Sequence, residues 1–274
     1  MHIKKMVNFS YYDYTLKRML IAGSILSTTS SVASALLVSP TTTAAGVVAI
    51  KDYSSIASGL FNNMRTPAAL IGGAIVPLGL LTAPPIQKDE SAKVQMLKKA
   101  NVLLAIAALL SELLAITYST VAINKLAEVK FAPTAGVSEL LSKNFELAWI
   151  GTNVHFLLGM FGFGLLVGTK AYFLYGDAVG KIAGCWSVAA FLQCTSIVNA
   201  GIAMGSGSTA DGGGATTRFA ANLFSLSWKY VMLVLSKARM RPLSIAAIGV
   251  GLYSVFLTVQ HLMELFSKSK GHED

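Results

Sequence analysis

Charged side chains are scarce in this chain of 274 residues, where Asp, Glu, Lys and Arg together make up 13%. A soluble domain typically has about 25%. Hydrophobic residues make up 54%, and the mean hydropathy is +0.60. This balance excludes a disordered chain, which needs high charge and low hydrophobicity, and it argues against a soluble globular domain. We therefore interpret the chain as an integral membrane protein.

Cysteine and histidine are also rare. Two Cys exclude a disulfide-rich scaffold and a Cys-rich zinc module. Four His leave few ligands for a metal site, so we expect none, and the sequence specifies no cofactor. The motifs of serine hydrolases, zinc proteases and phosphate-binding loops do not occur. We therefore expect a protein that is not an enzyme.

The net charge of +9 does not indicate a nucleic-acid partner. The basic residues lie in short clusters beside apolar runs, such as Lys98-Lys99, and no stripe of Lys and Arg interleaved with aromatic residues occurs. Clusters of this kind are typical of the loops that orient a membrane protein. We expect the lipid bilayer as the main partner, with other membrane subunits as further candidates.

The first 35 residues resemble a secretory signal peptide. Residues 1–18 carry four Lys or Arg side chains against one acid, and residues 19–35 are apolar, then small and hydroxylated, ending in Ala33-Ser34-Ala35. Residues 36–65 have the Ser-, Thr- and Ala-rich composition of a transit peptide.

Together these two segments resemble the bipartite presequence of algae with secondary plastids, although Leu36 stands where an aromatic residue is usual. The resemblance implies a plastid membrane. The alternative is an ordinary secretory signal that leads to the endomembrane system or the plasma membrane. The core, with Arg65-Thr66-Pro67-Ala68 and Phe145-Glu146, is similar to an uncharacterised multi-span membrane protein family of such algae, which implies no activity.

Long apolar runs predict the membrane spans, since a crossing helix needs about 20 apolar residues. Five runs are clear, at residues 67–86, 100–124, 147–169, 182–204 and 242–266. A sixth, at 219–235, contains Lys229, and a lysine at the bilayer centre costs about 2.5–3.5 kcal/mol. That run either spans the membrane or lies in its interface. We predict an all-α polytopic transmembrane bundle of five or six spans over residues 66–266, followed by a polar tail at 267–274.

Pairs of small residues four apart predict where the helices approach closely. Gly164 and Gly168 form one such pair, and Gly180 and Gly184 form another. In lipid, small residues of this kind allow close helix packing. We expect these glycines to pack helices within the bundle rather than to dimerise the protein.

Glu112, His155 and Gln193 are polar residues at similar depths of three predicted spans, so we expect them to form a cluster. Three hypotheses remain for this cluster. It joins helices by hydrogen bonds, it is the coupling site of a solute or ion carrier, or His155 is a ligand of a pigment or haem. His261 could be a second haem ligand only with six spans. The first hypothesis fits best, and it predicts a non-catalytic structural or assembly role.

Overall fold

The computed structural model describes residues 50–87, 90–204, 222–238 and 242–270. The predicted signal peptide, residues 36–49 of the transit-like segment, the Gly-rich stretch at 205–217 and the last four residues lie outside these ranges. The chain divides into two units, Met1–Val48 and Ala49–Asp274, and the described residues all belong to the second.

The described part of this unit consists of helices and their connections, with one isolated bridge between Lys51 and Thr134. The elements in chain order are α2 (Ser54–Ile75), the π-helix η3 (Val76–Leu81), α3 (Ala92–Glu128), α4 (Val137–Asn144), α5 (Glu146–Tyr175), α6 (Asp177–Met204), α7 (Leu223–Ala238) and α8 (Pro242–Lys270). Within the described ranges, five helical stretches are long and apolar enough to cross a membrane. The prediction of an all-α bundle with five clear spans is confirmed.

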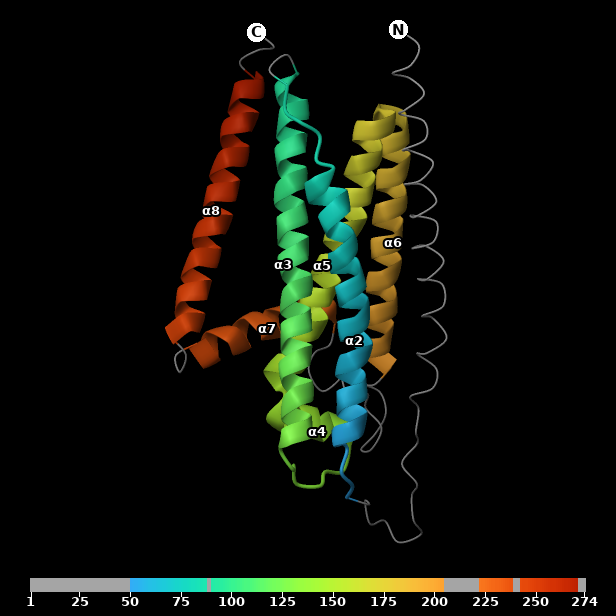
Figure 1. Cartoon of the computed structure of the whole chain (residues 1–274), viewed down its shortest axis with the longest axis vertical. Coiled ribbons are helices and arrows are strands. Elements are labelled where there is room, and N and C mark those ends of the chain that lie inside the picture. Colours follow the sequence, from blue (N-terminus) through green and yellow to red (C-terminus); the bar gives the residue numbers. More distant parts are fainter. Residues whose placement is uncertain (1–49, 88–89, 205–221, 239–241, 271–274) are drawn as a thin grey trace. The chain divides into compact units, whose positions relative to one another are not determined.

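Helix α7 is the predicted run that contains Lys229, and it is not one of the five spans. It has 16 residues and runs across the direction of the long helices (Figure 1).

Side A is the side on which α2 begins and α3 ends, and side B is the opposite side. With five spans, α8 begins on side A and ends on side B.

Helix α2 begins earlier than the composition predicts. Residues 54–65, assigned to the transit-like segment, form its first turns. Ala57 and Phe61 are fully buried there in an apolar cluster with residues of α3, α4 and α5, so packing rather than local composition decides their structure. Pro67 lies inside α2, and Pro77 lies in η3, where the wider turn accommodates a residue without a backbone N–H.

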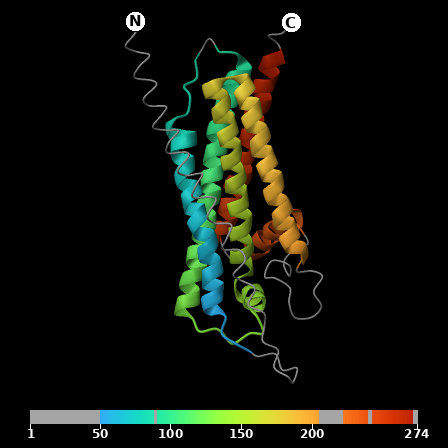
Figure 2. The same ribbon diagram turned by 90° about the vertical axis from the view of Figure 1, so that its right-hand side faces the viewer.

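Helix α3 lies between its neighbours and packs against α2, α5 and α8 (Figures 1 and 2). Its buried residues alternate in steps of three and four, as in a coiled-coil seam. Most of them are small. They are Lys98, Asn101, Ala105, Ala108, Glu112, Ala115, Ser119, Ala122 and Leu126.

Helix α5 faces this seam in the antiparallel direction. The hydroxyl oxygens of Ser119 and Thr152 lie 3.3 Å apart near side A, and Thr169 donates to Asn101 Oδ1 at 2.5 Å near side B. Between these contacts, a Cβ on Gly162 would lie only 2.5 Å from the Cβ of Ala108. The two backbones are therefore as close as a glycine allows.

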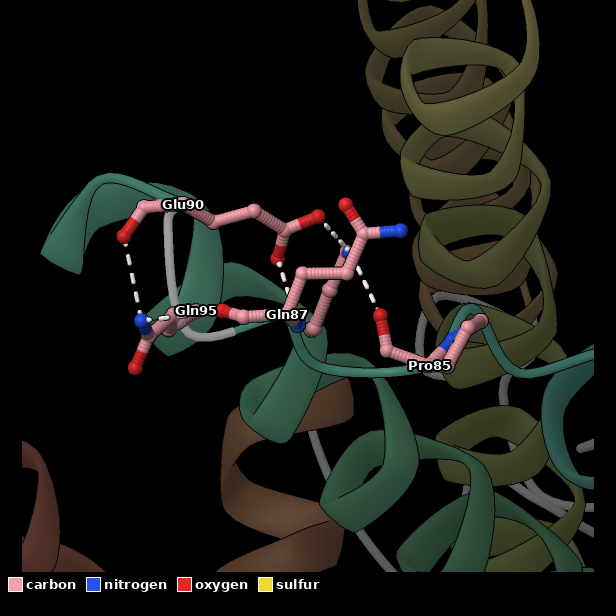
Figure 3. A network of polar contacts seen from close by, with 5 residues as sticks. Pro85, Gln87, Glu90 and Gln95 are labelled. Carbon is pink, nitrogen blue, oxygen red and sulfur yellow. Dashed lines mark hydrogen bonds and ion pairs between the residues drawn. The ribbon is translucent and has the colours of Figure 1, made fainter.

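Two lysines hold the chain just beyond the end of α2 on side B. Lys98 Nζ donates to the Pro85 carbonyl at 2.7 Å and also pairs with Glu90 (Figure 3). Lys170 of α5 donates to the Thr82 carbonyl. The carbonyl groups at a helix C-terminus attract cations, so these contacts fix the end of η3 and the residues after it against α3 and α5.

A first test concerns the α3–α5 contact. We expect Gly162→Ala to lower the free energy of unfolding by about 1–3 kcal/mol relative to Gly164→Ala, because the added methyl group overpacks the seam. Nothing lies within 4 Å of a Cβ at Gly164, so that variant is the matched control on the same helix. Thermal unfolding in a mild detergent measures both. Equal stability of the two variants would contradict the close approach.

The Glu90–Lys98 pair predicts a dependence on pH. The hydrogen bond from Lys98 lowers the pKa of Glu90 below the usual value of a glutamate carboxyl group. A lowered pKa in the folded state adds stability above the unfolded pKa and loses it as the pH falls through the folded pKa. We expect unfolding titrations below about pH 4.5 to show a loss of stability that is smaller in Glu90→Gln. The same loss in both proteins would contradict the pairing.

Candidate functional site

Glu112 lies in the middle of the α3 seam with none of its surface exposed. Its carboxyl group packs against Gly159 of α5, where an added Cβ would overlap it, and its stem faces Gly72 of α2. Neither carboxyl oxygen has a hydrogen-bond partner among the described residues. The carboxyl group therefore fills the space beside Gly159, which has no side chain of its own.

His155 lies one helical turn before Gly159 on α5 and contacts α7. Its Nε2 is 2.7 Å from the hydroxyl oxygen of Tyr230, while its Nδ1 is buried without a partner in the described part of the chain. The ring of Tyr118 stacks on the imidazole at 6.1 Å between centroids, and its hydroxyl lies 3.4 Å from that of Tyr230. These three rings form a cluster between α3, α5 and α7.

Lys229, the residue that made α7 ambiguous, pairs with Glu146 at 2.8 Å. Glu146 is the first residue of α5, so this ion pair lies at the side-A end of that helix. Together with the contact between Tyr230 and His155, it holds α7 against α5. The structure thus gives Lys229 a counter-ion in place of a position inside a span.

The predicted cluster of Glu112, His155 and Gln193 forms only in part. Glu112 and His155 share the α3–α5 interface, but no hydrogen bond joins them. Gln193 is exposed on α6. Similar depth is not sufficient for contact, because the rotation of each helix decides which way its side chain points. The expected hydrogen bonds from Glu112 to His155 or Gln193 are therefore a wrong prediction.

The hypothesis of a haem held by His155 and His261 required six spans. With five, the end of α8 lies on side B, whereas His155 lies in the part of α5 nearer side A. The side chain of His261 itself lies outside the described residues. The five spans found among the described residues do not include the sixth that this pairing requires, and His155 Nε2 already has Tyr230 as its partner.

The four predicted packing glycines lie between helices of one chain or at open positions. A Cβ on Gly168 would lie 3.3 Å from the Cα of Gly184, so α5 and α6 approach there. A Cβ added at Gly180 would lie 2.5 Å from the Cβ of Tyr172, so Gly180 packs against that residue across the turn between the same two helices. Gly164 has nothing within 4 Å of an added Cβ.

Sequence reasoning missed Tyr118 and Tyr230, and also the two polar pairs at the ends of the seam. The alternation of small residues in steps of three and four along α3 was the available signal for the seam. It places Asn101, Glu112 and Ser119 on one face of the helix. No local pattern marks Tyr230 as a partner of His155, because that contact depends on how α7 docks.

The contact between Tyr230 and His155 predicts a measurable loss. We expect Tyr230→Phe to lower the free energy of unfolding by about 1 kcal/mol, since it removes one half-buried hydrogen bond. Tyr253→Phe is the matched control, because Tyr253 is 62% exposed on α8. Chemical unfolding in detergent, followed by circular dichroism, compares the two. An effect of similar size in both variants would show that the hydrogen bond does not hold α7.

Comparison with known proteins adds no relative: no family model, curated protein or solved structure matches this chain. Among the described residues, no group of three or more His, Cys, Asp and Glu side chains gathers where it could hold a metal ion. The five apolar helices of the described part indicate a membrane protein.

Proposed function

We propose that this membrane protein acts without catalysis, as a structural or assembly component of a plastid membrane. The observation that carries the proposal is how the polar groups inside the spans are used. Thr169 bonds to Asn101, Ser119 lies beside Thr152, and Tyr230 bonds to His155. Each contact joins two helices. Polar side chains in membrane proteins commonly stabilise helix packing through such hydrogen bonds.

The outer helices support an assembly role. The apolar windows of α6 and α8 contain no buried residue, so the faces that these helices turn away from α5 and α3 are open to lipid or to another subunit. Both carry exposed aromatic side chains, with Trp186 on α6 74% exposed and Tyr253 on α8 62% exposed. Large aromatic residues are enriched at protein interfaces because they cover much area with few rotatable bonds.

The plastid address rests on the resemblance of residues 1–65 to a bipartite presequence. If the resemblance is functional, the mature chain begins after Ala35, and the protein reaches the plastid of an alga with secondary plastids. An intact Met1 on the mature protein would contradict this part of the proposal, and so would a mature protein found in the plasma membrane.

The experiment is to express the tagged full-length chain in such an alga, to locate it, and to isolate it in mild detergent. We expect a plastid signal and a particle larger than one chain of 28.9 kDa.

We expect Tyr253→Ala to weaken this assembly, because it removes an exposed aromatic ring from α8. Tyr172→Phe, on the α5 face that contacts Gly180, is the control.

A monomer in mild detergent, together with solute uptake by vesicles that is lost in Glu112→Gln, would overturn the proposal in favour of a carrier. The absorption spectrum of the same preparation tests the pigment hypothesis for His155. A bound chromophore that is lost in His155→Ala would favour a pigment-binding subunit instead.

A further inference from the structure

We propose that Glu112 is a proton-binding site of the folded protein, and that protons reach it from side A through Tyr230 and His155. This inference is independent of an assembly role, since a structural subunit can also bind a proton. Two buried groups at the α3–α5 interface lack partners in the described part of the chain: the carboxyl group of Glu112 and Nδ1 of His155. The other ring nitrogen of His155 lies within hydrogen-bond distance of Tyr230 on α7.

None of the described residues supplies Glu112 with a counter-ion. Helix α2 presents Gly72 to it, and the charged residue of that helix, Arg65, donates to Asn62 on the same helix at 2.9 Å. Helix α5 presents Gly159 and, one turn away, His155. On α3 itself the nearest titratable side chain toward side A is that of Tyr118, and the described titratable residue of α8, Tyr253, is exposed.

A buried carboxylate without a partner is strongly unfavourable in an apolar environment, whereas a neutral carboxylic acid is tolerated. A metal cation would need several oxygen ligands around the site. Gly72 and Gly159 supply no side chain, and their backbone groups lie within helices. A proton needs only the carboxyl oxygen itself, so it is the ligand that this site can bind.

The proposed proton route starts on side A, where the ion pair between Lys229 and Glu146 lies at the first residue of α5. The neighbouring residue on α7, Tyr230, is 2.7 Å from His155 Nε2. An imidazole can accept a proton at one ring nitrogen and release one from the other. In the proposed step, Nε2 accepts the proton of the Tyr230 hydroxyl while Nδ1 releases a proton, which an intervening water carries to the Glu112 carboxylate because no hydrogen bond joins the two side chains directly. Water on side A then returns a proton to Tyr230.

Toward side B, the titratable groups described on this face are Lys98 of α3 and Lys170 of α5, both at the far end of the seam and bonded to the chain after η3. Between Glu112 and that side, the seam continues with Ala108 against Gly162 and with Ala105, which are all apolar. The next polar pair, Asn101 and Thr169, contains no titratable group. The arrangement of the seam therefore favours entry from the side on which α7 lies.

The test uses the full chain in lipid vesicles at neutral pH and follows the infrared C=O band of protonated carboxyl groups. We expect a band that disappears in Glu112→Gln and shifts when the vesicles are transferred to heavy water. We expect the rate of this shift to fall about ten-fold or more in Tyr230→Phe and His155→Phe, because the proton loses its stepping groups. Thr169→Val, which changes a polar contact toward side B, is the control and should exchange like the wild type.

Each other outcome overturns the proposal. Without a band that depends on Glu112, the carboxyl group is ionised and binds no proton. An unchanged rate in both Tyr230→Phe and His155→Phe excludes the side-A route, and slower exchange in Thr169→Val alone places the route on side B. Circular dichroism verifies that each variant is folded, and Tyr230→Phe keeps the test valid if His155→Phe does not fold.

Discussion

The close approach of α3 and α5 is the constraint on which the other contacts depend. Lipid gives two apolar helices no hydrophobic reason to associate, so they must gain contact area by bringing their backbones together. The seam does this with small residues on both sides, as at Ala108 and Gly162. Because it runs through the central helix, its register also decides which residues α2 and α7 can contact.

Polar groups inside such a seam must either bond across it or be enclosed. Near its ends they bond across it, at Ser119 with Thr152 and at Thr169 with Asn101. At its centre Glu112 is enclosed by glycine backbone without a partner. The same helix pair therefore contains contacts that stabilise packing and one carboxyl group whose chemistry differs from theirs, which is why the structural role and the proton site can coexist.

Hydropathy predicted the fold well because a span is a local property of about 20 residues. It failed where tertiary contacts decide. The first turns of α2 look like a presequence by composition but bury Phe61, and Gln193 has the depth of Glu112 but points outward. Of the predicted cluster, Glu112 and His155 were found at one interface, whereas Tyr230 depends on the docking of α7, which no local pattern encodes.

The most direct test of this account is the register of α3 against α5. In a background with Cys185→Ser and Cys194→Ser, the pair Ser119→Cys and Thr152→Cys should form a disulfide in membranes, because the native hydroxyl oxygens lie 3.3 Å apart. The control pair, Ser119→Cys with Phe156→Cys, is shifted by one turn and should remain reduced. Cross-linking of the shifted pair in preference to the first would move Gly159 away from Glu112 and contradict the account.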